Sequence, residues 1–289
     1  GTVCNLRFIL PEEFANHRNA LQRQVFLDEV SYEQCKQNRV DSHLYNAVLN
    51  ALKNAISTTK YLSINDFMPV LNDVLNSGAY DRGVIVAESF DYEIIDKAYA
   101  PYENLSLLVS LKSTGDIEKK VIGSVVESIK ADYQFEADWA RLVEIFRKPS
   151  LQMISFTITE KGYGVAPHDL ERGMKPVLAM GKVAALLYER FQAGQLPLTV
   201  QSMDNCSHNG DKLYAAVNAF AKSWVENGVV DAGFKAYVND KSKVTFPWSM
   251  IDKITPRPDA SVEAILKADG VEELEPVVTS KNTWVAPFV

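Results

Sequence analysis

The chain has 289 residues, of which 47% are hydrophobic and 23% charged, so it can bury a sizeable core in one large or two small domains. A formal net charge of −7 without clustered Lys and Arg excludes a general nucleic-acid surface. Three cysteines without paired spacing predict neither a disulfide framework nor a zinc site. No apolar run reaches the roughly 20 residues of a membrane helix, and the start lacks a signal-peptide pattern, so we expect a cytoplasmic protein.

The first 60 residues carry the weakest patterns in the chain. Residues 44–56 have apolar side chains at helical spacing, and residues 64–76 repeat that spacing before a helix stop at Ser77 and Gly78. We therefore expect residues 1–60 to be helical, and the residues themselves suggest no role for them.

A buried parallel strand is predicted at residues 83–88, a short, β-branched apolar run that ends in Glu88. Nucleotide-binding α/β domains place an acidic residue at the end of such a strand to accept hydrogen bonds from ribose hydroxyls. Glu88 is the first candidate for that role and Asp91 the second. A helix N-cap or a solvated acid remains the alternative interpretation of the same pattern.

The middle of the chain alternates strand and helix patterns, which predicts an open, mostly parallel α/β sheet with helices on both faces. Strands are predicted at 105–111, 120–124 and 151–159, and helices at 139–146 and 174–191, with a loop at 163–176. The strand at 151–159 delivers a polar cluster at its carboxyl end, namely Thr159, Glu160, Lys161, Gly162 and Tyr163. Further on, we expect a helix at 261–269 and a strand at 276–279.

Residues 198–213 form the stretch around which the chain is organised: a short apolar strand, a polar loop and the start of a helix that runs to about Gly228. The loop holds Asp204, Asn205 and His208, and Asn209 is predicted to cap the helix. Ligands of open α/β sheets bind beyond the carboxyl ends of strands, so this loop and residues 159–163 should face one crevice.

Four reaction types can be weighed against these residues. No Gly-x-Ser-x-Gly turn supports a Ser-His-Asp hydrolase, and no Gly-x-x-x-x-Gly-Lys-[Ser/Thr] loop supports a P-loop kinase. A metal site is weakly indicated, because Asp204 and His208 lie in a loop without a third ligand. Hydride transfer to a nicotinamide cofactor remains, since it requires mainly a cofactor platform and hydrogen bonds that orient a hydroxylated substrate.

Three long motifs, at residues 155–163, 202–210 and 245–257, closely resemble the mannitol dehydrogenase family of long-chain polyol dehydrogenases, which includes fructuronate and tagaturonate reductases. The resemblance implies a metal-independent, NAD-linked oxidoreductase that interconverts a sugar alcohol or aldonate with its ketose or keto-uronate. It also implies that residues 61–289 form a Rossmann-like NAD-binding domain, with residues 1–60 unassigned.

The resemblance also implies roles for individual residues. Asp204, Asn205 and Lys161 would act in catalysis, and the cofactor would be bound by Glu88, Asp91, Thr159, Glu160 and Asn209. Pro247, Ser249 and Asp252 would close the cleft. An acidic Glu88 would favour NAD over NADP, because the 2′-phosphate of NADP would meet a carboxylate.

The sequence departs from the family pattern in two places. Residues 60–69, where a Gly-rich pyrophosphate-binding loop is expected, contain no glycine, so the backbone does not offer the close approach that such a loop provides. The family's Lys-x4-Asn-x2-His motif belongs to a helical C-terminal domain that would begin near Val289. Asn205 and His208 match only its second half, with Val200 in place of the Lys. A non-catalytic nucleotide- or sugar-binding module is therefore the alternative function.

Overall fold

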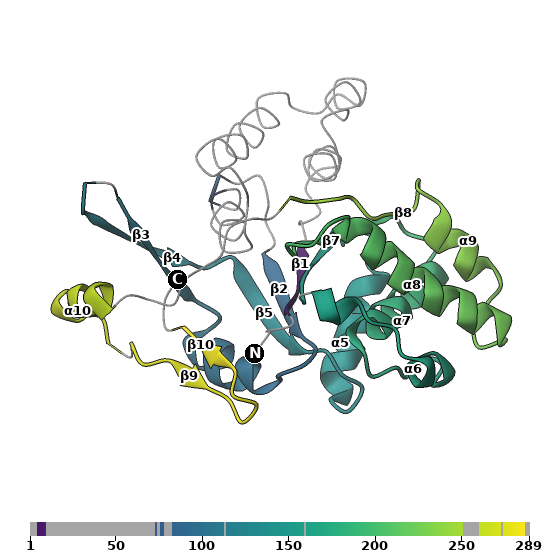
Figure 1. Cartoon of the computed structure of the whole chain (residues 1–289), viewed down its shortest axis with the longest axis horizontal. Helices are drawn as coiled ribbons and strands as arrows, with labels where there is room; N and C mark the ends of the chain where they lie inside the picture. The colour runs from purple at the N-terminus through teal and green to yellow at the C-terminus, as the bar shows by residue number, and fades with distance from the viewer. Residues whose placement is uncertain are drawn as a thin grey trace, which may run out of the picture.

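The computed structural model describes residues 5–9, 73, 76, 77, 83–112, 114–158, 160–250, 260–272 and 274–286. Six of the described strands form one sheet in the order β5-β2-β1-β6-β7-β8 (Figure 1). They are β1 (Asn5–Ile9), β2 (Val84–Glu88), β5 (Val125–Lys130), β6 (Met153–Thr157), β7 (Leu198–Ser202) and β8 (Val244–Thr245).

Five of these six strands run in the same direction. β2 pairs in parallel with β5, and β7 pairs in parallel with β6 and β8. β1 is antiparallel to both of its neighbours, so its first residue, Asn5, lies opposite Glu88 and Thr157. The amino-terminal end of β1 therefore shares an edge with the carboxyl ends of the parallel strands, which we call the carboxyl edge.

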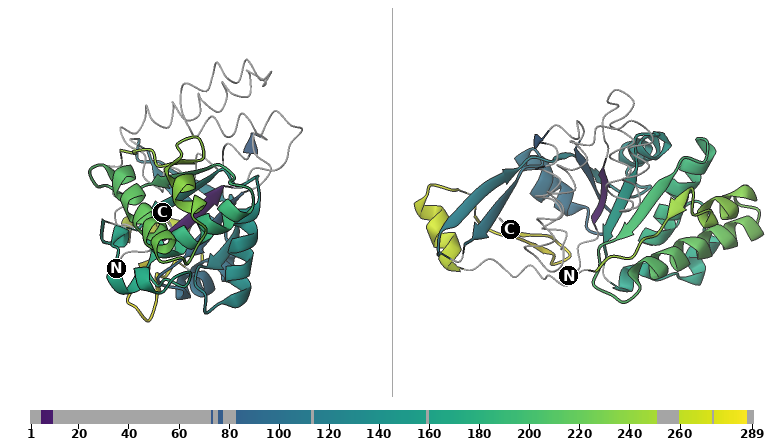
Figure 2. Two further views of the ribbon diagram at one scale, coloured as in Figure 1. Left: turned by 90° about the vertical axis from the view of Figure 1, so that its right-hand side faces the viewer. Right: turned by 90° about the horizontal axis from the view of Figure 1, so that it is seen from above.

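One layer of helices covers the sheet. It consists of α5 (Glu136–Arg147), α7 (Ala179–Gln192) and α8 (Asn209–Glu226), with α6 (Pro167–Glu171) and α9 (Gly233–Asn239) packed outside it (Figures 1 and 2). Their apolar faces meet the sheet in one core, in which Phe156, Phe220 and Trp224 have no exposed surface. The aromatic stripe of α8 thus contributes to the core, because its spacing puts these side chains on the face turned towards the sheet.

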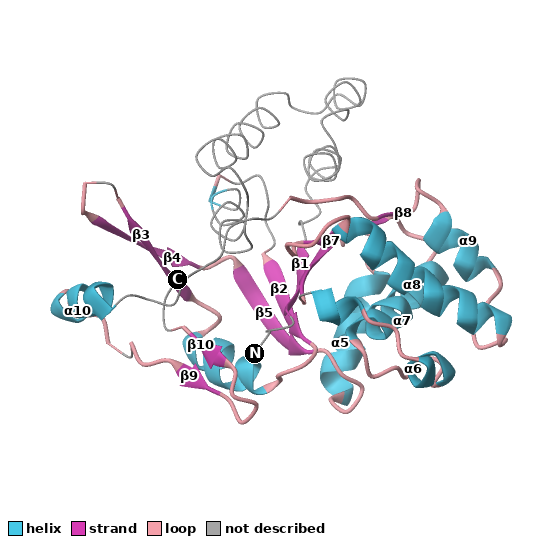
Figure 3. Ribbon diagram, in the orientation of Figure 1, coloured by secondary structure: helices cyan, strands magenta, loops and turns pink. Residues whose placement is uncertain are grey.

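A second, smaller group of elements lies beside β5 and β2 (Figure 3). It contains the hairpin of β3 (Ser106–Leu111) and β4 (Ile117–Ile122), α10 (Ala260–Ala268), and the short strands β9 (Val277–Val278) and β10 (Trp284–Val285). α10 packs Val262 and Leu266 against Leu107 and Val109 of the hairpin. The described residues also form three short helical turns, namely η1 (Ile95–Tyr99), η2 (Ala100–Tyr102) and η3 (Glu160–Tyr163).

Most of the predicted elements are confirmed. Where the prediction was wrong, local signals were weak: β5 was not predicted, residues 5–9 are a strand rather than helix, and α6 lies within the predicted loop at 163–176. The other predicted helical segments before Gly83 lie almost wholly outside the described residues. No described helix combines the length and the apolar character that crossing a membrane requires.

Candidate functional site

One group of polar residues, here called the Asp204 cluster, gathers where β6 and β7 end. It consists of Asp204, Tyr163, Ser202, Asn209 and Ser249. Asp204 is buried, and its Oδ2 accepts hydrogen bonds from the Ile158 N–H at 3.0 Å and from the Tyr163 hydroxyl at 2.5 Å. Burial raises the pKa of Tyr163, and the negative charge of Asp204 raises it further. The phenol therefore stays protonated and donates a hydrogen bond to this carboxylate.

Ser202 closes the cluster on the β7 side. Its hydroxyl lies 2.5 Å from the Tyr163 hydroxyl and accepts from the Asp204 N–H at 3.3 Å. Tyr163 follows β6 and Asp204 follows β7, so their contact confirms the prediction that the polar segments after these two strands meet. The carboxyl ends of the two adjacent parallel strands bring them together.

Asn209 does not cap α8 in the way that the sequence suggested. The N-cap residue is His208, in the left-handed conformation with φ of 53°, and its side chain makes no capping hydrogen bond. The Asn209 side chain instead donates to the Asp204 carbonyl at 3.1 Å and to Ser249 Oγ at 2.8 Å, and its Oδ1 accepts from the Ser249 N–H. Asn209 thus ties the segment that follows β8 to the loop that follows β7.

Gly210 permits this junction. A Cβ atom on Gly210 would lie 2.5 Å from the Phe246 carbonyl oxygen and 2.7 Å from that of Pro247, both of which are backbone atoms. Only glycine fits at this position without a backbone shift. The start of α8 can therefore approach residues 246 and 247 closely enough for Asn209 to reach Ser249.

Exposed polar side chains surround the buried Asp204. Asn205, Glu160 and Lys161 are all exposed, and Glu160 forms an ion pair with Lys212 of α8. The hydrogen bond from Lys212 lowers the pKa of Glu160. Thr159 and Asp252, which the resemblance also implicates, lie outside the described residues.

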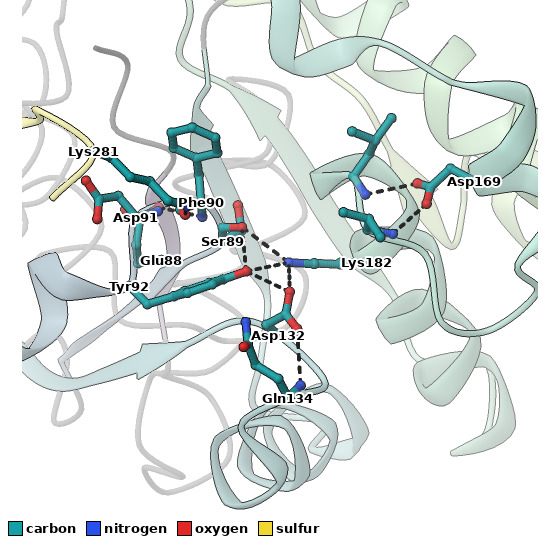
Figure 4. A network of polar contacts seen from close by, with 12 residues as sticks. Glu88, Ser89, Phe90, Asp91, Tyr92, Asp132, Gln134, Asp169, Lys182 and Lys281 are labelled. Atoms are coloured by element: carbon teal, nitrogen blue, oxygen red, sulfur yellow. Dashed lines mark hydrogen bonds and ion pairs between the residues drawn. The ribbon is translucent and has the colours of Figure 1, made fainter.

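A second group, here called the Lys182 cluster, lies at the ends of β2 and β5 (Figure 4). It consists of Lys182, Asp132, Tyr92, Ser89 and Glu88. Lys182 of α7 is 1% exposed, and its Nζ donates to Asp132 Oδ2 at 2.5 Å, to the Tyr92 hydroxyl at 3.1 Å and to the Ser89 carbonyl at 3.2 Å. Burial acts to raise the pKa of Asp132, but the hydrogen bonds from Lys182 and Tyr92 outweigh it and lower that pKa.

Glu88, the predicted ribose acceptor, is fully buried. Its Oε1 accepts from the N–H groups of Phe90 at 2.8 Å and Asp91 at 3.1 Å, so it caps the turn after β2, and its role as a ribose acceptor stays a prediction. Its Oε2 has no hydrogen-bond partner among the described residues. Burial raises the pKa of this carboxyl to about 7, against the lowering effect of the two N–H groups.

Asp91, the second candidate, is 1% exposed. Its Oδ2 accepts from the Thr279 hydroxyl at 2.6 Å, and the neighbouring Lys281 donates to the Phe90 carbonyl and lies 4.3 Å from the centre of the Phe90 ring. The turn between β9 and β10 therefore covers the residues that follow β2.

The residues along the carboxyl edge differ in how well they would fit a bound dinucleotide. At the β2 end, the unpartnered Oε2 of Glu88 is an acceptor suited to ribose hydroxyls. In the middle, β1 presents its first residue, Asn5, at this edge, whereas a Rossmann domain presents the carboxyl end of a parallel strand to the pyrophosphate. Within the described residues, no three His, Cys, Asp or Glu side chains gather as a metal site requires.

Sequence reasoning missed two residues that organise the Lys182 cluster, namely Asp132 and Lys182. Lys182 had a readable signal, because it interrupts an otherwise apolar face next to Val183 and Ala184. A charge on a buried face predicts a partner in the same core. Asp132 had none, since an aspartate in a polar loop is ordinary.

Comparisons with known proteins agree with the motifs. The family model described as the mannitol dehydrogenase Rossmann domain matches residues 77–283. D-mannonate oxidoreductase of Thermotoga maritima is 48% identical over 231 residues, which is 76% of this chain and 42% of that protein. Mannitol 2-dehydrogenase of Cereibacter sphaeroides is 31% identical over 202 residues, which is 65% of this chain and 40% of that protein.

Among solved structures, the chain resembles the ternary complex of Pseudomonas fluorescens mannitol 2-dehydrogenase with NAD and D-mannitol. The TM-score is 0.48 and the identity 29%, over 65% of this chain and 37% of that chain. This chain therefore spans less than half the length of these relatives. The family model, by contrast, matches more than half of this chain, and the match runs from before β2 to the β9–β10 turn. The chain belongs to the mannitol dehydrogenase family and contains the Rossmann domain of that family.

Proposed function

We propose that this chain is the cofactor-binding part of an NAD-dependent oxidoreductase that interconverts a sugar alcohol or aldonate with its ketose or keto-uronate. The observation that carries the proposal is the Asp204 cluster, a buried carboxylate fixed at the ends of β6 and β7 inside a domain of this family. The 48% identity to a D-mannonate oxidoreductase, against 31% to a mannitol 2-dehydrogenase, favours an aldonate of the mannonate type as substrate.

The residues present supply orientation and recognition. Asp204 would accept a hydrogen bond from the hydroxyl group of the reacting carbon, and the exposed Asn205 and Lys161 would donate to the carbonyl group of the oxidised form. The NAD nicotinamide accepts or donates the hydride when it is bound, and no metal ion takes part. Glu160 and Asn209 on this side, together with Thr159, are proposed to bind the nicotinamide end, and Glu88 with Asp91 the adenosine ribose. We place the enzyme in the cytoplasm, in keeping with the odd number of cysteines.

Calorimetric titration of the 289-residue chain with NADH, and separately with NADPH, tests the proposal. We expect saturable binding of NADH that is clearly tighter than that of NADPH. Absence of heat up to millimolar NADH, a binding free energy of only about 4 kcal/mol, would contradict the proposed cofactor site. That result would favour a non-catalytic module instead.

The role of Asp204 needs a separate measurement. Asp204→Ala should leave the dissociation constant of NADH nearly unchanged, and the equivalent change in a full-length relative should lower turnover of mannonate. Equal losses in cofactor binding and turnover would show that Asp204 maintains the fold and has no selective role in catalysis.

A further inference from the structure

Lys182 carries a positive charge in the interior of the molecule. Its side chain is 1% exposed, and its ammonium group has three hydrogen-bond acceptors, namely Asp132 Oδ2, the Tyr92 hydroxyl and the Ser89 carbonyl (Figure 4). An ammonium group has three N–H donors, so every donor is used. Tyr92 also donates to Asp132 Oδ2 at 2.6 Å, which closes the ring of contacts.

Stability alone does not account for this arrangement. Removing two opposite charges from water opposes folding, and an apolar pair of similar volume is often as stable or more stable. What the charged pair adds is a fixed geometry, because it joins three separate elements: α7, the turn after β2 and the loop after β5. A pair of apolar side chains would fill the same space without fixing the Ser89 carbonyl or the Tyr92 hydroxyl.

The turn at residues 89–92 is the part of the chain on which these contacts converge. Lys182 holds Ser89 and Tyr92, at the two ends of the turn. Glu88 Oε1 accepts the N–H groups of the two residues between them, Phe90 and Asp91. Every residue of this turn is thus fixed by a buried charged or ionisable side chain, and the turn lies where a Rossmann domain meets the adenosine ribose.

We propose that Lys182 is a positioning residue for cofactor recognition, which sets the turn at 89–92 in the conformation that receives the adenosine half of the dinucleotide. This inference rests on the proposed function. Lys182 itself does not touch the cofactor, since its donors are all used within the protein. Its contribution reaches the ligand through the backbone of Ser89 and the hydroxyl of Tyr92.

Two variants separate positioning from stability. Lys182→Met removes the charge and the three hydrogen bonds, and leaves Asp132 without its cation. The double variant Lys182→Met/Asp132→Leu removes both charges and replaces them with an apolar pair. Lys97→Met is the control, because Lys97 of η1 belongs to the same segment but forms an exposed ion pair with Glu93.

The readouts are the thermal midpoint and the dissociation constants for NADH, 5′-AMP and reduced nicotinamide mononucleotide. Lys182→Met should lower the thermal midpoint and weaken the binding of NADH and AMP about tenfold or more. The dissociation constant of the mononucleotide should change less than twofold. The double variant should regain most of the thermal midpoint and still bind NADH and AMP weakly. Lys97→Met should match the wild type in every readout.

The outcomes distinguish this inference from the proposed function. If the double variant regains both its thermal midpoint and wild-type affinity for NADH and AMP, Lys182 only stabilises the fold and the inference is wrong. Equal weakening of AMP binding and mononucleotide binding would also overturn the inference, because the effect would not be confined to the adenosine half of the cofactor. If the wild-type chain binds neither NADH nor AMP, the proposed function fails, and the inference fails with it.

Discussion

The Lys182 cluster and the Asp204 cluster occupy the same edge of one sheet, yet they hold their carboxylates differently. In the Lys182 cluster a buried cation contacts Asp132, and Glu88 binds the backbone of its own turn. In the Asp204 cluster the carboxylate accepts from a phenol and a backbone N–H, and exposed polar side chains stand beside it. The first arrangement fixes the shape of a turn, and the second holds one buried carboxylate in place between two loops.

Because the two clusters hold their carboxylates differently, substitutions in them should affect different properties of the protein. Contacts of the Lys182 cluster link three elements through charge, so its variants should alter pH dependence and recognition. Contacts of the Asp204 cluster involve close backbone approach and neutral donors, so its variants should alter stability with little dependence on salt. Four substitutions test this difference, from the largest expected effect to the smallest.

Glu88→Gln should remove a pH dependence of about 3 kcal/mol from the free energy of unfolding. The folded-state pKa is raised to about 7 from 4.5, so the native protein retains a proton that the unfolded chain releases. The stability due to this proton is complete below pH 4.5 and is lost as the pH rises to about 7. Urea unfolding from pH 4 to 8 measures it, with the exposed Glu136→Gln as control. An unchanged pH profile in Glu88→Gln would disprove the assignment.

Gly210→Ala should destabilise the fold by about 2 kcal/mol, because the added Cβ meets two backbone carbonyl oxygens within 2.7 Å. The strain falls on the contact between α8 and residues 246–247, and so on the hydrogen bonds between Asn209 and Ser249. Gly123→Ala is the matched control, since its Cβ would only reach a Leu105 side-chain atom at 3.6 Å. Urea unfolding of both variants gives the difference, and equal stability would show that the junction adjusts freely.

Tyr163→Phe should destabilise the protein by about 1–2 kcal/mol, since Asp204 loses a buried donor and the Ser202 hydroxyl loses its contact with the phenol. The raised pKa of Tyr163 adds a second signature. The unfolded chain releases this proton near pH 10 and the native protein does not, so wild-type stability should fall as the pH rises above 10. The stability of Tyr163→Phe should fall less steeply in that pH range. Tyr214→Phe, which removes an exposed hydrogen bond, serves as the control.

The sequence predicted the parts of this comparison that depend on local patterns. β2, β6 and β7 were recognisable from β-branched apolar runs, and parallel strands place their following loops at one edge, so Asp204 was found. The direction of β1 was not predictable, because strand orientation depends on partners far away in the chain. The same holds for the surroundings of Asp91, whose carboxylate accepts from Thr279, 188 residues later in the chain.

The smallest effect is expected at the exposed ion pair between Glu160 and Lys212, which joins η3 to α8 beside the Asp204 cluster. Glu160→Gln should leave the urea midpoint unchanged, because exposed ion pairs add little once side-chain entropy and solvent screening are counted. If Glu160 binds the nicotinamide end as proposed, however, NADH affinity should fall severalfold, and Glu226→Gln at the other end of α8 should not change it. A lower urea midpoint with unchanged NADH affinity would instead assign Glu160 a structural role, and would remove it from the proposed cofactor site.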